Sequence, residues 1–504
     1  MLVAVVVIIV LAVIPLLAPF LAPRLSNSGQ EKSLPPGPRG LPILGNLLSL
    51  GKNLHLDLHK LSQKHGPIMS LRIGFTRAVV VSSPKSAELF LKTHDLAFAG
   101  RPPQESMKYL AYGQKNLSFS PYGPYWRNVR KTVTLELLTS RKVNSMKPIR
   151  EEGVGSLVKY LKDASRERAV VNISERIKSL TADISCRMIF GNKFEDKGSI
   201  GRGFLTAFRE LSEVTNAPNV GNFFPFVANF DLQGLTKKMK GISKVFDTFL
   251  ESVLDDHMSS RKMDEGSRDL VDAMLGFIGS DHSRNAFERD HVKAIILDLF
   301  IAAADTTATL AEWVMSELIR NGTIMKKLQG ELAQLVGMQR TVEEFEIEAL
   351  EYLNMVIKEG MRLHPPVPLL LPHMAIEDTV VNGFRIPRNT MVIVNAWSIG
   401  RDPSAWIEPE KFCPERFQGS QIDVNGQHFQ LLPFGAGRRG CPGAQLALSI
   451  IRFVVAQLVH CFDWELPDGM PGTELDMTEE FGIVTTRAKD LKVIPSYRLK
   501  IDKR

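Results

Sequence analysis

The stretch Phe434-Gly-Ala-Gly437-Arg-Arg439-Gly-Cys441-Pro-Gly443 places one cysteine on a turn that is rich in glycine and flanked by arginine. Glycine adopts positive φ angles easily, so this backbone can wrap closely around a sulfur atom. Backbone N–H groups and the charges of Arg438 and Arg439 then favour the thiolate over the thiol. Residues 444–452 read as a helix, and a helix N-terminus also favours negative charge. The stretch therefore predicts a loop that holds an anionic sulfur.

Five of these residues resemble, position by position, the haem-ligand signature of the cytochrome P450 superfamily: Phe434, Gly437, Arg439, Cys441 and Gly443. The resemblance implies that Cys441 is the axial ligand of the iron in haem b, and that the other four belong to the cofactor-binding loop. Taken alone, the motif has a second reading, a surface glycine loop with an incidental cysteine. Further motifs extend the resemblance over nearly the whole chain.

Composition sets the frame for one large protein body. The chain has 504 residues, of which 44% are hydrophobic and 23% charged, so it can bury a large core. Its four cysteines, at positions 186, 413, 441 and 461, have no short spacing of the kind that frames disulfides or zinc, which suits a reducing compartment. The net charge of +7 comes with no basic tract and no nucleic-acid motif. A membrane or an acidic partner protein explains it better than nucleic acid.

The N-terminal segment predicts a membrane anchor. Residues 1–22 carry no charged side chain, and as a helix they would span about 33 Å, enough for a hydrocarbon core of about 30 Å. Basic residues follow this segment, so the positive-inside rule leaves the body cytosolic; the alternative is a cleaved signal peptide. We expect an anchor over 1–23, a polar and proline-rich hinge over 24–40, and a catalytic domain over 41–504. The family resemblance implies single-pass anchoring in the endoplasmic-reticulum membrane.

The remaining pattern predicts a mainly α protein with small β-sheets (α+β), which the resemblance identifies as the cytochrome P450 fold enclosing a haem. The expected helices cover 86–93, 125–138, 149–165, 175–190, 237–258, 290–320 and 351–363, and the expected strands cover 68–73, 78–82, 379–386, 391–395 and 491–495.

The helix over 290–320 is apolar around almost its whole circumference until Asp305 and Thr306 interrupt it. A buried hydroxyl needs a partner, so we expect Thr306 to bond back to the carbonyl of Ala302 or Ala303 and to loosen the helix locally. The run 302–307 resembles the family's oxygen-activation signature. That resemblance implies that Asp305 and Thr306 organise proton delivery to dioxygen. A helix kink made by Asp and Thr is the structural alternative, and Ala303 stands where a glycine is common in the family.

Two further groups match the family's motifs. Glu359 and Arg362 lie three apart on a predicted helix and can pair; the resemblance implies that they lock to Arg416 in a structural role. The resemblance also implies that four residues contact the haem propionates: Trp126, Arg130, His373 and Arg439. Arginine suits such carboxylates because its guanidinium group binds them through two parallel hydrogen bonds.

Substrate-facing positions come from analogy with the family's pocket walls: Phe119, Ala304, Val367, Leu371, Phe481 and Ile483, each of which also suits ordinary core packing. The stretches 98–102, 121–127 and 362–366 resemble the plant A-type microsomal branch. The chain is thereby identified as a haem-thiolate monooxygenase for a small lipophilic metabolite, terpenoid first and then phenylpropanoid or alkaloid. It would use O2 and electrons from NADPH through NADPH–cytochrome P450 reductase. A haem-thiolate isomerase or dehydratase that needs no reductase, and a non-enzymatic haem-binding protein, are the alternatives.

Overall fold

A computed structural model describes residues 34–191, 193, 197–259, 269–278 and 287–500. The predicted anchor over 1–23 and the polar part of the predicted hinge lie outside these residues. The proline-rich end of the hinge lies along the first strand of the sheet: Pro35 O accepts a hydrogen bond from Ser70 Oγ at 2.7 Å, and Pro36 O accepts one from Ser70 N at 2.8 Å. A side chain at Gly37 would begin only 2.0 Å from Ser70 O, so glycine permits this close approach.

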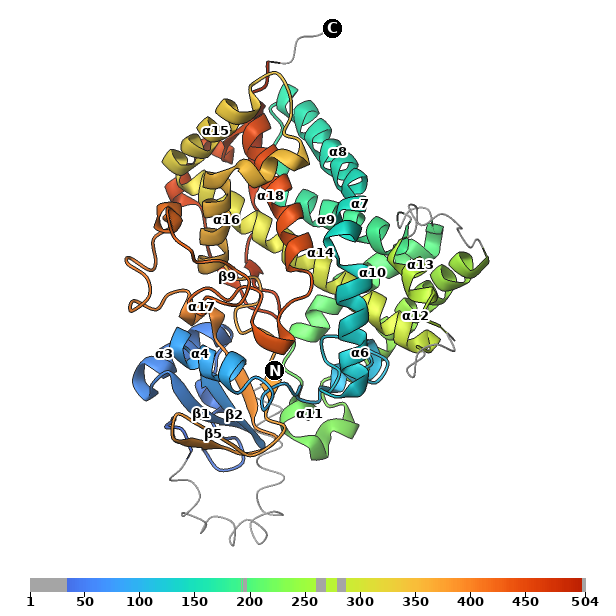
Figure 1. Cartoon of the computed structure of the whole chain (residues 1–504), viewed down its shortest axis with the longest axis vertical. Helices are drawn as coiled ribbons and strands as arrows, with labels where there is room; N and C mark the ends of the chain where they lie inside the picture. The colour runs from blue at the N-terminus through green and yellow to red at the C-terminus, as the bar shows by residue number, and fades with distance from the viewer. Residues whose placement is uncertain (1–33, 192, 194–196, 260–268, 279–286, 501–504) are drawn as a thin grey trace, which may run out of the picture.

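Helices form most of the molecule, and two long ones cross its middle, α14 (Arg289–Arg320) and α18 (Ala444–Cys461) (Figure 1). Both are long and apolar enough to cross a membrane, yet both are largely buried, as expected of core helices in a large domain. The other helices are α3 (Leu54–His65), α4 (Pro84–Glu88), α5 (Glu105–Leu110), α6 (Pro124–Thr132), α7 (Ser140–Ser145), α8 (Lys147–Arg166), α9 (Ile173–Phe190), α10 (Gly198–Asn216), α11 (Val220–Phe223), α12 (Leu235–Ser259), α13 (Leu270–Leu275), α15 (Gly322–Val336), α16 (Glu351–Leu363) and α17 (Ala396–Ile399).

Four small sheets are formed by the residues that the structure describes. The largest has the order β1-β2-β7-β4 and sits with α3 and α4 at one end of the molecule, where its first two strands are drawn in blue and the other two in orange in Figure 1. Only the pairing of β2 with β7 in it is parallel, and it joins segments more than 300 residues apart along the chain. The strands are β1 (Ile68–Ile73), β2 (Thr76–Val81), β3 (Val171–Asn172), β4 (His373–Met374), β5 (Thr379–Val381), β6 (Phe384–Ile386), β7 (Met391–Val394), β8 (Phe462–Glu465), β9 (Glu479–Glu480), β10 (Thr486–Arg487) and β11 (Lys492–Tyr497).

The mainly α architecture with small sheets is confirmed, and the long apolar helix predicted over 290–320 begins one residue earlier, at Arg289. Two predicted helices are confirmed with a different last turn, and one predicted strand was wrong. The helices expected over 86–93 and 125–138 each end in a π-helical turn, Leu89–Thr93 and Val133–Leu137. The strand expected over 379–386 is a hairpin, because Asn382 and Gly383 take positive φ angles of 51° and 82° and reverse the chain.

Candidate active site

The cysteine loop is a tight turn closed by backbone hydrogen bonds. Cys441 N donates to Phe434 O at 2.9 Å, and Gly440 N donates to Gly437 O at 3.1 Å. Gly437 has a φ of 67°, and a side chain there would begin 2.3 Å from Leu91 O. Glycine is therefore required at this position by conformation and by space together. The turn ends where α18 begins, at Ala444, so Cys441 lies just before a helix N-terminus as predicted.

The surroundings of the sulfur act on its charge in opposite directions. Burial raises the pKa of the Cys441 thiol, whereas a hydrogen bond from the Gly443 backbone and the charge of Arg130 lower it. The residue is exposed, so its own surface is open to a small molecule although protein atoms surround it at longer range. The prediction that Arg438 and Arg439 supply the charge was wrong. Arg438 pairs with Asp95, and Arg439 binds backbone carbonyls elsewhere.

Two arginines at the loop, Arg130 and Arg439, have no carboxylate partner among the described residues, unlike Arg438. Arg130 Nη1, on α6, donates to Gly440 O at 2.7 Å. Arg439 donates to Ala99 O at 2.8 Å and to Ser120 O at 2.7 Å, and its guanidinium group lies 4.2 Å from the ring centre of Trp126. Burial and then the charge of Arg130 lower the pKa of Arg439 to about 10. The structure thus brings together the predicted residues Trp126, Arg130 and Arg439.

Sequence reasoning missed one member of this cluster. Arg101 is 6% exposed, and its guanidinium group donates to Leu371 O at 2.7 Å, to Pro372 O at 2.8 Å and to Ser118 O at 2.9 Å. Burial and then the charge of Arg439 lower its pKa to about 9. The predicted His373 lies beside it, with Nδ1 2.9 Å from Phe98 O, and burial followed by the charge of Arg101 lowers the pKa of this histidine to about 3.

The donor set suits a haem. Within the described part of the chain, Arg101, Arg130 and Arg439 form no ion pair with a carboxylate. Their hydrogen bonds go to backbone carbonyls, which neutralise none of the charge. Partly buried cations of this kind need an anion, and the two propionates of a haem supply one beside a cysteine that can bind its iron. Trp126 Nε1 donates to Leu117 O at 3.0 Å in this structure, so its predicted propionate contact remains a prediction.

α14 carries the predicted acid and alcohol. Thr306 Oγ1 donates to Ala302 O at 2.6 Å, which confirms the expected back-bond, while α14 remains an uninterrupted helix across this turn. Burial raises the pKa of Asp305 to about 6, and the charge of Lys178 on α9 opposes this rise. Ala302 is exposed although it sits in the middle of a core helix. That exposure indicates an internal space on its side of α14.

The predicted structural group is assembled as expected. Glu359 is fully buried and accepts hydrogen bonds from Arg362 Nε at 2.7 Å and Arg362 Nη2 at 2.8 Å. The same carboxylate accepts from Arg416 Nε at 3.0 Å and from Cys413 N at 2.7 Å. It thereby ties α16 to the segment that leads into the cysteine loop.

The structure brings only some of the predicted pocket residues together. Phe119 packs in a small apolar cluster with Leu371, whereas Phe481 stacks on His55 with ring centres 5.2 Å apart and belongs to another cluster. Ala304 is 2% exposed within α14, and Ile483 is 37% exposed. Val367 is partly buried, and the neighbouring Pro366 O accepts a hydrogen bond from Thr485 N, which draws this loop toward the C-terminal loop.

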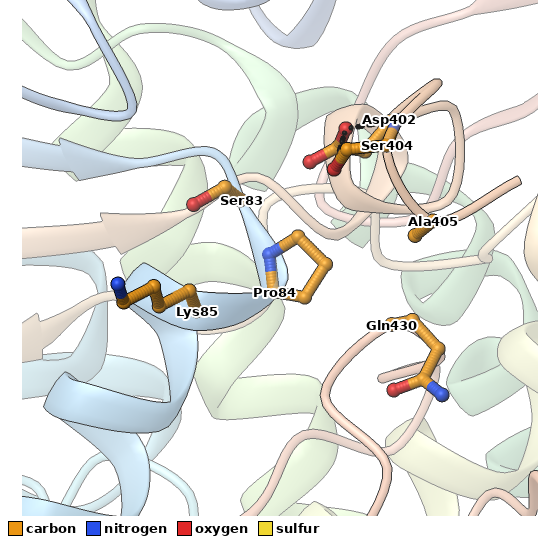
Figure 2. A pocket seen from close by; sticks show the side chains of 7 residues that line it. All are labelled: Ser83, Pro84, Lys85, Asp402, Ser404, Ala405 and Gln430. Atoms are coloured by element: carbon orange, nitrogen blue, oxygen red, sulfur yellow. Dashed lines mark hydrogen bonds between the residues drawn. The ribbon is translucent and has the colours of Figure 1, made fainter.

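A surface groove of about 340 Å³ lies elsewhere, between the start of α4 and the turn after α17 (Figure 2). None of its lining residues is a predicted site residue: Ser83, Pro84, Lys85, Asp402, Ser404, Ala405 and Gln430. Asp402 Oδ1 accepts hydrogen bonds from the backbone N–H of Ser404 at 2.9 Å and from its hydroxyl at 2.7 Å, so this carboxylate oxygen already has local partners. This groove offers no group suited to the chemistry of the cysteine loop.

Comparison with known proteins agrees with the geometry of the site. The Cytochrome P450 family model matches residues 35–493. The chain is 46% identical over 486 residues to Cytochrome P450 CYP736A12 of Panax ginseng, covering 95% of this chain and 96% of that protein. It is 40% identical over 485 residues to Melianol synthase CYP71BQ5 of Azadirachta indica, covering 95% of each chain.

Solved structures show the same architecture. A zebrafish cytochrome P450 determined with progesterone aligns with a TM-score of 0.76 and 27% sequence identity, covering 88% of this chain and 99% of that one. The family model, the plant relatives and this structural match agree with the haem-ligand loop and the mainly α fold. The chain belongs to the cytochrome P450 family and is a plant haem-thiolate monooxygenase, which works with haem, O2 and electrons supplied by a reductase.

Proposed function

We propose that this protein inserts one oxygen atom of O2 into a small lipophilic specialised metabolite, with terpenoids favoured and phenylpropanoids or alkaloids next. The terpenoid preference is supported by the relative named for melianol synthesis, which is terpenoid-related. Phe119 and Leu371, which lie in one apolar cluster, suit a substrate with a hydrocarbon surface. Arg101 donates a hydrogen bond to Leu371 O and so positions this part of the pocket wall. The same arginine lies near Arg439 of the cysteine loop, whose charge lowers its pKa.

The observation that carries the proposal is the acid and alcohol pair on α14. A bound haem supplies the iron at which dioxygen is activated. The chain's own part is to hold that iron through Cys441 and to deliver protons beside it. Asp305, with a pKa near 6, exchanges protons readily close to neutral pH. Thr306 donates its hydroxyl proton in a hydrogen bond to Ala302 O, and rotation about χ1 would let the same O–H donate to a group in the site instead.

The electron donor is NADPH, through NADPH–cytochrome P450 reductase. α6 supports this partner because Arg127 and Lys131 are exposed on the helix whose Arg130 contacts the cysteine loop at Gly440. An acidic protein that docks on this helix comes close to the ligand side of the haem. Charge complementarity of this kind raises the association rate and weakens in salt.

The location we propose is the endoplasmic-reticulum membrane, with an anchor over 1–23, a hinge over 24–40 and the catalytic domain over 41–504 in the cytosol. Two exposed aromatic side chains support this orientation, Phe75 and Phe226, which are 41% and 44% exposed. Phe75 and Phe226 touch, with ring centres 5.5 Å apart, and Phe75 N donates to Phe223 O. An exposed aromatic patch next to the start of the described chain suits a lipid surface.

The test is a panel of terpenoids, phenylpropanoids and alkaloids incubated with NADPH and microsomes that contain the protein and a plant reductase. We expect one class to yield product with NADPH and none without it. Thr306→Ala should consume NADPH while releasing peroxide, because proton delivery to oxygen fails. Product formed without NADPH would instead support an isomerase or dehydratase. Equal product from wild type and Thr306→Ala would remove Thr306 from the mechanism.

A further inference from the structure

A hydroxyl from a neighbouring helix reaches the turn of α14 that carries the acid and alcohol pair. Thr181 lies on α9, is 1% exposed, and donates through Oγ1 to Ala304 O at 2.9 Å. Its own helix offers two other acceptors, Lys178 O at 3.1 Å and Ile177 O at 3.2 Å. A buried threonine in a helix ordinarily bonds back to its own i−4 or i−3 carbonyl, and here the shortest bond crosses to α14 instead.

The hydrogen bond from Thr181 reaches the carbonyl of Ala304, the residue that immediately precedes Asp305 and Thr306. Thr306 itself bonds to Ala302 O at 2.6 Å. Successive residues of an α-helix are about 100° apart, so the carbonyls of residues 302 and 304 lie on nearly opposite sides of α14. Hydroxyls therefore bond to this turn of α14 from two sides: Thr306 of the same helix bonds to Ala302 O, and Thr181 of α9 bonds to Ala304 O.

Burial of a hydroxyl in this region does not by itself produce such a bond. Thr307 and Thr309, on the same turns of α14, are 1% exposed, and their Oγ1 atoms have no hydrogen-bond partner among the described residues. Valine has the same shape as threonine, and burying valine avoids the free-energy cost of removing a hydroxyl from water. A threonine at position 181 therefore offsets that cost only through the hydrogen bond that its hydroxyl makes. The partner in that bond is the carbonyl that leads into the catalytic pair.

We propose that Thr181 is a positioning residue for the monooxygenase reaction: its hydroxyl braces Ala304 O and so fixes the orientation of Asp305 and Thr306. The inference rests on the proposed proton-delivery role of that pair. The hydrogen bonds of Thr181 among the described residues go to backbone carbonyls alone. It acts through the backbone of α14, in the same way that a hydrogen-bonded neighbour orients a catalytic side chain.

Three variants isolate the hydroxyl. Thr181→Val removes the hydroxyl and keeps the shape, and Thr181→Ser keeps the hydroxyl. Thr309→Val is the matched control, because it removes from α14 a buried hydroxyl that has no hydrogen-bond partner among the described residues. Each is purified with haem and reconstituted with reductase and the terpenoid of the panel that gives the most product. The ratio of peroxide released to product formed is measured. Loss of one hydrogen bond corresponds to about a five-fold rise of this ratio in Thr181→Val, whereas the serine and control variants stay near wild type.

Amide hydrogen exchange gives a readout that is independent of turnover. In Thr181→Val we expect peptides that cover 304–310 to exchange about five-fold faster, because the brace on this turn is gone, while the start of α14 at 292–297 is unchanged. Thr309→Val should show no faster exchange. If Thr181→Val does not incorporate haem, Thr181→Ala compared with Thr181→Ser isolates the same hydroxyl.

The outcomes separate this inference from the proposed function. If Thr306→Ala releases peroxide while Thr181→Val matches wild type in both readouts, Thr181 is not a positioning residue and the proposed function stands. If Thr306→Ala forms product normally, the proposed catalytic pair fails and the positioning role fails with it, whatever the exchange rates show. Faster exchange with an unchanged peroxide ratio would reduce Thr181 to a structural residue.

Discussion

Replacing Glu359 by glutamine removes the buried anion that Arg362, which is also buried, and the partly buried Arg416 share. The carboxylate accepts two hydrogen bonds from Arg362 and one each from Arg416 and Cys413 N. Arg362 is itself buried, and its other hydrogen bonds go to the backbone carbonyls of Gly400, Pro409 and Lys411. In Glu359→Gln these carbonyls remain, but the charge of Arg362 loses its buried counter-ion.

The expected loss is about 3–5 kcal/mol, the usual consequence of leaving one partner of a buried ion pair uncompensated. A domain of ordinary stability unfolds with about 5–15 kcal/mol, so this single change removes a large share of it. The effect should also reach the cysteine loop, because Glu359 fixes the segment around Cys413 and Arg416 that precedes that loop. We therefore expect poorer haem retention together with lower stability.

Guanidinium-induced unfolding, followed by far-ultraviolet circular dichroism in detergent, measures the change. The matched control is Glu88→Gln, which removes an exposed ion pair with Lys92 whose side chains are 46% and 58% exposed. Surface i,i+4 pairs contribute at most about 0.5 kcal/mol, so this control should unfold like wild type. A Glu359→Gln protein that unfolds at the wild-type denaturant concentration and retains haem would refute the assignment.

Three further changes test the site. Burial raises the pKa of Asp305 to about 6. The protonated carboxyl therefore contributes fully to the free energy of unfolding below about pH 4, and this contribution is lost as the pH rises through 6. Wild type should therefore lose about 1.4 kcal/mol per pH unit over that window relative to Asp305→Asn, and parallel stability curves would contradict the shift. Arg101→Gln should lose haem to apomyoglobin about ten-fold faster, because a charge-assisted bond to a propionate disappears; an unchanged transfer rate would exclude Arg101 from the haem site. Gly437→Ala should form little of the cysteinate-haem band with carbon monoxide, since its Cβ would lie 2.3 Å from Leu91 O, and a normal band would show that the loop tolerates a side chain.

The sequence was most informative where one local pattern determines the structure. The apolar run of α14 predicted its extent to within one residue, because a helix that is apolar all round has to lie in a core. The glycines of the cysteine loop likewise predicted a turn, and Gly437 does have a positive φ angle. The back-bond of Thr306 was predicted correctly, but not for the reason given, because Thr306 is only partly buried while the buried hydroxyls of Thr307 and Thr309 have no partner among the described residues.

Sequence reasoning failed where distant segments converge. Arg101 meets the carbonyls of Leu371 and Pro372, 270 and 271 residues away, and Thr181 meets Ala304, 123 residues away. Neither partner can be deduced from local periodicity. The same limit explains why the wrong arginine was assigned to the sulfur. Arg438 is nearer to Cys441 in sequence, but it pairs with Asp95, and the charge that lowers the pKa of Cys441 comes from Arg130 on α6.

The most direct test of the account is the absorption spectrum of the reduced, purified protein under carbon monoxide. The account predicts the red-shifted band of a cysteinate-bound haem in wild type and its disappearance in Cys441→Ala, with the fold retained by circular dichroism. A wild-type protein that binds haem but lacks this band, or a Cys441→Ala protein that keeps it, would contradict Cys441 as the iron ligand.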